Sequence, residues 1–154
     1  MRKLKNLFKS NIYINKERND NMLEKNNLIF IYGKAGNYKS SIGVSLLNST
    51  DKKACYINLD NNHLKTNDNI NVFNEVSDIN FIKKCISDYS IILIDYIELL
   101  EINKNELLEL KELVKNKNKT LIIISCCSNN KELINNSHYV ELKEIADLMI
   151  LTDR

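Results

Sequence analysis

The sequence predicts an α/β protein in which helices cover both faces of a mostly parallel sheet. Apolar runs rich in β-branched residues recur along the chain, and between several of them the apolar period changes to that of a helix. Strands that alternate with helices favour parallel pairing, because each helix carries the chain back along the sheet. All three glycines, Gly33, Gly36 and Gly43, also lie within eleven positions directly after the first apolar run, which indicates a specialised strand-to-helix turn.

The predicted elements follow one another without repeats or low-complexity linkers. The predicted strands are residues 28–32, 54–59, 70–73, 91–95, 121–125 and 148–151. The predicted helices are residues 41–47, 79–86 and 107–114, in which apolar side chains return every three or four positions. Ser77 or Asp78 is the predicted N-cap of the second helix, and Asn105 is that of the third.

Residues 1–26 stand apart as a basic appendage to a core domain at 27–154. We expect Leu4, Leu7 and Phe8 to form one face of a short basic helix, followed by a polar connection over residues 15–27. Basic residues outnumber acidic ones in this segment, which is typical of a solvated tail and also of a segment that contacts nucleic acid. The net charge of the whole chain is only +2, so composition alone does not indicate nucleic-acid binding.

Length and composition are those of a single globular domain. The chain has 154 residues, of which 44% are hydrophobic and 27% charged. No apolar run approaches the roughly 20 residues of a membrane span, and the basic start lacks the apolar stretch of a secretory signal. The four cysteines show no CxxC spacing, which argues against structural zinc and is consistent with a reducing compartment. We therefore expect a cytoplasmic protein that is not associated with a membrane.

The segment after the first strand has the spacing of a Walker A phosphate-binding loop. Backbone amides of such a loop surround the phosphates, while Lys39 would reach the β- and γ-phosphates and the Ser40 hydroxyl would ligate Mg²⁺. The predicted nucleotide-binding residues are Gly33, Lys34, Ala35, Gly36, Asn37, Tyr38, Lys39, Ser40 and Ser41. Tyr38 stands where a glycine normally precedes the lysine, so a turn that binds nothing is the alternative.

The strand at 91–95 ends in a carboxylate, which is the Walker B pattern. In this interpretation Asp95 holds Mg²⁺ through water or through the Ser40 hydroxyl. Many buried strands also end in an aspartate that only caps the next helix. The position of Asp95 after a strand that follows the phosphate loop favours the metal-binding interpretation.

Several segments together resemble the RecA-like motor domain of DnaB-type replicative helicases. IILIDYIELL is similar to that family's hydrophobic-Asp-Tyr-Leu-Gln-Leu segment, and CYINLDNN to its strand ending in Ser-Leu-Glu-Met. INVFNEVSDINFIKKCI and KEIADLMILTDR resemble its next strand and helix and its closing segment, so the likeness covers about residues 28–154. The resemblance implies a three-layer RecA-like P-loop fold. In that fold strand 121–125 lies between strands 28–32 and 91–95, with 54–59 beyond 91–95.

The resemblance also implies roles for single residues. Asp60 falls on the glutamate that polarises the attacking water in that family, which makes Asp60 and Lys39 the predicted catalytic residues, although Asp60 also suits an ordinary turn. Where the family has a γ-phosphate-sensing glutamine, this chain has Cys126, and we expect Cys126 and Cys127 to be packing residues. The family's basic hairpin has no counterpart before Arg154, so a processive helicase is not expected.

The sequence therefore predicts a domain that binds ATP and Mg²⁺ and hydrolyses ATP weakly or not at all. The resemblance suggests an accessory role in DNA replication or recombination, with DNA, a replication or recombination protein, or further copies of the chain as partners. A non-catalytic interaction module with a degenerate nucleotide site is the main alternative. A small phosphotransferase is less favoured, because no arginine-rich lid segment is found.

Overall fold

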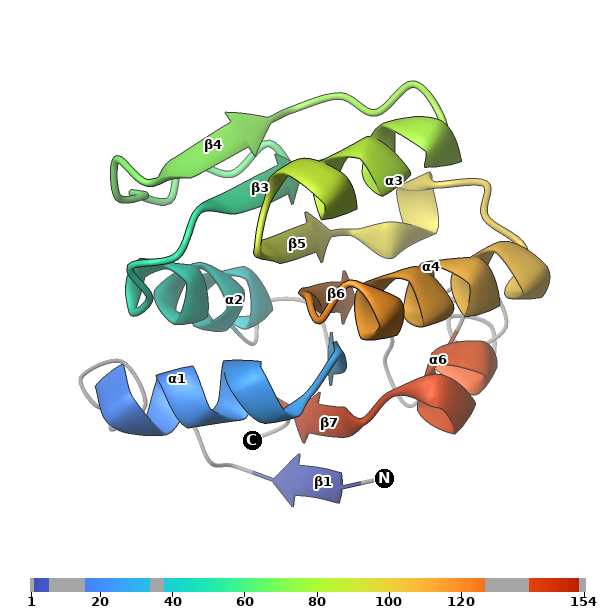
Figure 1. Ribbon diagram of the computed structural model, residues 1–154, viewed down its shortest axis with the longest axis horizontal. Helices are drawn as coiled ribbons and strands as arrows, with labels where there is room; N and C mark the ends of the chain where they lie inside the picture. The colour runs from blue at the N-terminus through green and yellow to red at the C-terminus, as the bar shows by residue number, and fades with distance from the viewer. Residues whose placement is uncertain (1, 6–15, 34–37, 127–138, 153–154) are drawn as a thin grey trace.

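A seven-stranded sheet of parallel strands forms the centre of the molecule (Figure 1). The computed structural model describes residues 2–5, 16–33, 38–126 and 139–152. The strands are β1 Arg2–Lys5, β2 Leu28–Tyr32, β3 Ala54–Asn58, β4 Ile70–Phe73, β5 Ile91–Asp95, β6 Thr120–Ser125 and β7 Leu148–Leu151. The helices are α1 Lys16–Lys25, α2 Lys39–Asn48, α3 Ile79–Asp88, the 3-10 helix η1 Ile97–Leu99, α4 Lys104–Asn116 and α6 Tyr139–Ile145.

The strand order confirms the predicted topology. The order across the sheet is β1-β7-β2-β6-β5-β3-β4, so β6 lies between β2 and β5, and β3 lies on the far side of β5. All the predicted strands are present, and each is buried on both faces where it lies in the middle of the sheet. This burial explains why these strands are continuous apolar runs and do not alternate with polar residues.

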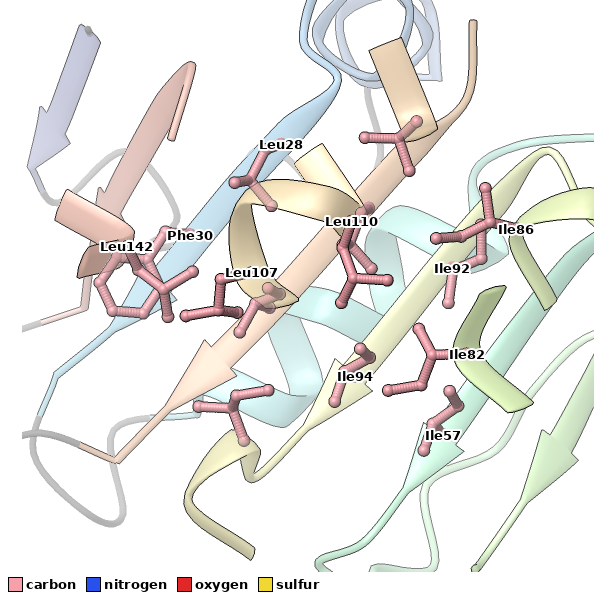
Figure 2. Close-up of a cluster of buried hydrophobic side chains, with 14 of the residues drawn as sticks. Leu28, Phe30, Ile57, Ile82, Ile86, Ile92, Ile94, Leu107, Leu110 and Leu142 are labelled. Carbon is pink, nitrogen blue, oxygen red and sulfur yellow. The ribbon is translucent and has the colours of Figure 1, made fainter. Parts of the chain in front are cut away.

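Two hydrophobic clusters fill the space between the sheet and the helices, which gives the predicted three layers. Successive side chains of a strand point to opposite faces, so Leu28 and Phe30 join one cluster while Ile29 and Ile31 join the other. The first cluster packs under α3, α4 and α6, as the labelled side chains in Figure 2 show. The second cluster packs under α1 and α2.

Helix α2 lies close to the sheet because Gly43 has no side chain. A Cβ atom at this position would lie 2.9 Å from Ile124 Cδ1 and 3.1 Å from both methyl carbons of Leu93. These distances are shorter than an ordinary van der Waals contact, so a larger residue would push the helix outward. The third glycine of the sequence therefore sets the position of the helix that begins at Lys39.

The helix caps agree with the sequence at one helix and differ at another. Asp78 caps α3 as predicted, since its side chain accepts hydrogen bonds from the amides of Asn80 and Phe81. The predicted cap of α4 at Asn105 is wrong, because Asn103 and Glu106 form a reciprocal capping box one half-turn earlier. The box adds a polar first turn to the helix, ahead of the apolar pattern that begins at residue 107.

The N-terminal segment differs from the predicted basic helix and polar connection. Residues 2–5 form strand β1, which pairs in parallel with β7 and extends the sheet. Residues 16–25 form helix α1, whose Met22 and Leu23 are buried in the cluster under α1 and α2. Backbone pairing with a strand far along the chain stabilises β1, and such pairing leaves no apolar pattern in a short basic segment. Leu7 and Phe8 lie outside the described residues, and the boundary at residue 26 stays a prediction. None of the helices in the described part of the chain combines the length and apolar character needed to cross a bilayer.

Candidate nucleotide-binding site

The predicted site residues meet at the carboxyl end of the sheet, which is the side where the parallel strands end. Tyr32 at the end of β2 lies opposite Ser125 at the end of β6. Asp95 at the end of β5 lies opposite Asn58 at the end of β3. Because all the strands run in the same direction, loops that are far apart in sequence open onto the same side.

The predicted phosphate loop follows β2 and precedes α2 at this end of the sheet. Gly33 is buried and has a φ of 154°, a value that favours glycine, and it directly follows β2. Lys34, Ala35, Gly36 and Asn37 lie outside the described residues. Tyr38 precedes α2 in a left-handed conformation, with φ 61° and ψ 23°, and the residue is 60% exposed. Tyr38 therefore adopts a left-handed conformation that glycine would take without steric cost, while most of its surface is exposed to solvent.

The first turn of α2 brings Lys39 and Ser40 to the end of β5. Lys39 is buried, with 7% exposure, and its positive charge acts on the carboxylates of Asp95 and Glu98. The Ser40 hydroxyl donates a hydrogen bond to the Asp95 carboxylate. Ser41 follows in the same turn and is half-buried. The structure thus places the lysine, the hydroxyl and the carboxylate of the two predicted motifs side by side.

Asp95 belongs to a buried polar network. Its Oδ2 atom accepts a hydrogen bond of 2.6 Å from the Tyr56 hydroxyl and one of 3.2 Å from Asn62 Nδ2. Asn62 also donates to the Tyr56 hydroxyl, so the three side chains contact one another. Burial raises the pKa of Asp95 above its ordinary value, although the hydrogen bonds from Ser40 and Tyr56 and the charge of Lys39 act in the opposite direction. Burial and the same carboxylate also raise the pKa of Tyr56, which keeps its hydroxyl a donor.

Asp60 lies near this network but on its exposed side. It sits in the turn after β3, where the Asn61 amide donates to the Asn58 carbonyl and Asn61 has a φ of 52°. Its side chain is exposed, and its charge contributes to the raised pKa of Asp95. The placement is compatible with a water-orienting group and with a turn aspartate, so the catalytic role of Asp60 stays a prediction.

Glu98 is a site residue that the sequence did not single out. It lies in η1, just beyond Asp95, and its Oε1 atom accepts hydrogen bonds from the Ser125 hydroxyl and from the Cys126 amide, the latter at 3.0 Å. Burial raises the pKa of Glu98 against the effect of these donors and of Lys39. Cys126 is half-buried with a free thiol, so its amide has a role at the site that the packing interpretation did not include, and Cys127 lies outside the described residues.

The residues missed by sequence reasoning left weak signals. Tyr56 lies inside an apolar strand, where it is read as a core residue, and only its position two residues before the end of β3 places its hydroxyl near Asp95. Glu98 follows a Walker B strand within a short acidic and apolar stretch, where it resembles an ordinary surface glutamate. An acidic residue one turn beyond the Walker B aspartate was the available signal.

Comparisons with known proteins support the fold. Neither a family model nor a curated protein matches the chain. Among solved structures, the flagellar accessory protein FlaH from Methanocaldococcus jannaschii superposes with a TM-score of 0.58 at 16% identity, over 81% of this chain and 70% of FlaH. The fold is that of a P-loop NTPase.

Two further structures agree with this assignment. A DNA replication initiation factor gives a TM-score of 0.55, and AMPPCP-bound DnaA from Aquifex aeolicus gives 0.54, each at 19% identity and over 88% of this chain. The chain spans 43% of the length of each of these two proteins. The likeness is to the P-loop NTPase fold as a whole, and it does not single out DnaB-type helicases.

Proposed function

We propose that this chain binds ATP together with Mg²⁺ at the start of α2, hydrolyses it weakly, and serves as an accessory domain in DNA replication or recombination. The observation that carries the proposal is the convergence of Lys39, Ser40 and Asp95 at the carboxyl end of the sheet. A helix N-terminus attracts phosphate through its free amides and its dipole, and a buried lysine beside it adds a full positive charge. The AMPPCP-bound DnaA structure supports a nucleotide ligand for this fold.

The donor set suits Mg²⁺. The Ser40 hydroxyl and the Asp95 carboxylate are in contact, and both are hard oxygen ligands of the kind Mg²⁺ prefers. Mg²⁺ usually takes only one or two protein ligands and fills its other positions with water and phosphate oxygens. When bound, the ion would neutralise phosphate charge. In this chain Tyr56 and Asn62 orient the carboxylate and Ser40 supplies the second oxygen.

The role in replication or recombination is the less direct part of the proposal. Its support is the likeness of the fold to a DNA replication initiation factor and to DnaA, together with the basic segment at the start of the chain. A nucleotide site of this kind would give such a domain an ATP-bound and an ADP-bound form. A partner that binds the two forms with different affinity would then respond to the nucleotide state.

Thermal unfolding with ATP, ADP and GTP, each with and without Mg²⁺, tests the nucleotide site. ATP at about 100 times its dissociation constant should add roughly 2.7 kcal/mol to the free energy of unfolding. Lys39→Ala should abolish this gain, and Asp95→Asn should remove mainly its Mg²⁺-dependent part. Lys115→Ala is the matched control, because Lys115 is an exposed lysine near the end of α4.

The two variants also separate the main proposal from its alternative. If Lys39→Ala binds ATP as tightly as the parent protein, the phosphate-loop assignment is wrong. If no nucleotide stabilises the parent protein at millimolar concentration, the non-catalytic interaction module becomes the better description.

A further inference from the structure

An apolar groove opens beside η1, between the starts of α3 and α4 (Figure 1). Its volume is about 390 Å³. Its apolar lining comes from the segment before α3, from α3 itself and from the segment between η1 and α4, and consists of Val76, Ile79, Ile82, Leu100 and Ile102. Ile82 and Ile102 are buried, whereas the other three are half-buried and reach solvent. The groove is therefore an open extension of the hydrophobic core under α3 and α4.

Leu99 lies at the rim of the groove, and 60% of its surface is exposed. The chain on either side of it is well anchored, since Glu98 is hydrogen-bonded to the end of β6 and both Ile97 and Ile102 are buried. The Leu100 amide also donates to the Ile97 carbonyl, which closes a tight turn around Leu99. An exposed apolar side chain that is held by a fixed turn and is continuous with an apolar groove is typical of an interaction site.

The charged side chains around the groove are all acidic. Asp78, Glu101 and Glu106 line it, and no basic residue does so within the described part of the chain. Lys83 and Lys104 lie on the same two helices but form ion pairs with glutamates elsewhere. Each of the two helix starts contributes roughly half a positive charge, which offsets only about one of the three carboxylates. The groove therefore attracts a basic partner.

The composition of the lining restricts how a partner can bind. None of the described lining residues belongs to a strand, so a peptide cannot extend the sheet at this place. None of them is aromatic, whereas proline-rich segments dock between aromatic side chains. Nucleic acid is disfavoured because its phosphates would face the carboxylates. An amphipathic helix suits the groove, because it inserts apolar side chains at positions i, i+3, i+4 and i+7.

We propose that this groove binds a basic amphipathic helix of a partner protein. The apolar face of the helix packs against Leu99 and into the groove, and its flanking lysine or arginine side chains face Asp78, Glu101 and Glu106. Burial of apolar surface provides most of the affinity, while the charges select basic partners and make binding sensitive to salt. The proposal goes beyond the nucleotide site and does not depend on it.

Fluorescence anisotropy with two designed, fluorescein-labelled peptides and the full chain tests the proposal. Both peptides place leucine at i, i+3, i+4 and i+7 of a helix, and the remaining positions are lysine in one peptide and glutamate in the other. We expect the lysine peptide to bind at least about tenfold more tightly, and salt to weaken its binding. Leu99→Ser should weaken binding of the lysine peptide about tenfold, because the burial of the leucine is lost. Glu101→Lys should reduce the preference for the lysine peptide.

Two substitutions on α4 provide matched controls. Leu108 and Glu112 are exposed and lie outside the groove, so Leu108→Ser and Glu112→Lys should each bind the lysine peptide within about twofold of the parent protein. Leu99 and Glu101 are exposed as well, so their substitutions should leave the fold intact, which circular dichroism checks. Addition of the lysine peptide should also shift the amide resonances of Ile79 and Leu99 in NMR spectra.

The remaining outcomes overturn the proposal. It is wrong if the lysine peptide fails to bind at millimolar concentration, if both peptides bind equally, or if Leu99→Ser leaves the affinity unchanged. If the groove instead binds duplex DNA, or if sedimentation shows a dimer of the chain that Leu99→Ser dissociates while the peptide does not bind, the occupant is not a partner helix. The ATP-induced thermal shift is a separate measurement, because its absence refutes the proposed nucleotide site and leaves the peptide result standing.

Discussion

Asp147 at the amino end of the sheet is partly exposed and accepts hydrogen bonds from a lysine and two amides, whereas Asp95 at the carboxyl end is fully buried and one oxygen of Glu98 there has no donor among the described residues. The Oδ1 atom of Asp147 accepts a hydrogen bond of 2.6 Å from Lys111, and its Oδ2 atom accepts bonds of 2.9 Å from the amides of Asn27 and Leu28. Burial alone would raise the pKa of Asp147, but these donors outweigh it and lower the pKa. At the carboxyl end burial prevails, and the pKa values of Asp95 and Glu98 are raised.

The two ends of the sheet also differ in backbone conformation, and again the less favourable arrangement is at the carboxyl end. Tyr38 and Tyr96 both have left-handed conformations, and both directly precede helices at the carboxyl end. At the amino end Asn118 before β6 is also left-handed, but asparagine tolerates this conformation better than tyrosine. A non-glycine residue in this region costs about 1–2 kcal/mol. The amino end of the sheet therefore stabilises the fold, while the carboxyl end carries strain and incompletely satisfied charge, as expected of a binding site.

The largest expected effect concerns the amino end. Asp147→Ala should lower the free energy of unfolding by about 3 kcal/mol, because it leaves two amides without their acceptor and leaves Lys111, which is only 15% exposed, with the Ile145 carbonyl but without a counter-charge. Urea unfolding at neutral pH measures this. The exposed pair Lys104–Glu144 provides the control, and Glu144→Ala should cost less than about 0.5 kcal/mol. A loss below about 1 kcal/mol for Asp147→Ala would show that water replaces the carboxylate. The ATP-induced shift should be unchanged, since the substitution lies at the opposite end of the strands.

A smaller effect concerns the strained loop. Tyr38→Gly should raise the free energy of unfolding by about 1 kcal/mol, because glycine adopts the left-handed conformation without steric cost and the exposed ring buries little area. Asn118, with a φ of 55°, is the matched control, and Asn118→Gly should change stability little because asparagine tolerates this region. Destabilisation by Tyr38→Gly would mean that contacts of the ring outweigh the strain.

The smallest effect is the pH dependence of stability. Asp95 and Glu98 have folded pKa values above their unfolded values, so the folded state binds protons more readily and stability should rise as pH falls from neutral towards about 4. Asp147 has the opposite sign, and its contribution should be lost as pH falls through and below about 4. Urea unfolding at several pH values should show a smaller rise in Glu98→Gln and a smaller acid loss in Asp147→Asn. Parallel curves for the parent and both variants would contradict these signs.

The central sheet was predictable because its signals are local and strong. Long apolar runs define β2, β5 and β6, and the spacing from Gly33 to Lys39 locates the loop that follows β2. The resemblance to RecA-like domains supplied the strand order, which periodicity alone does not determine. For the proposed site, the sequence motifs named Lys39, Ser40 and Asp95, which the structure brings together, and their role in binding a nucleotide stays a prediction.

The parts that were not predicted depend on contacts between distant segments. Strand β1 is stabilised by pairing with β7, and the short basic sequence of residues 2–5 does not indicate that pairing. In the sequence Tyr56 looks like an ordinary core residue of an apolar strand. Only the structure shows that its hydroxyl donates a hydrogen bond to Asp95. In the sequence Glu98 looks like an ordinary surface glutamate. Only the structure shows that two donors at the end of β6 bind its carboxylate. Asn103 is an exception, since its capping box with Glu106 was visible in the sequence and was missed by one half-turn.

The neighbours of β2 in the sheet determine when the predicted phosphate loop can form during synthesis. Strand β2 pairs only with β6 and β7, whose residues are made more than half a chain length later. Lys39 and Ser40 therefore leave the ribosome long before the strands that flank β2, which are β6 and β7, have been synthesised. Until residues 120–151 emerge, β2 offers two unpaired backbone edges to any other strand in the cell, which is a hazard for sheets with such non-local pairing. The same arrangement delays completion of the proposed nucleotide site until β6 and β7 have been made.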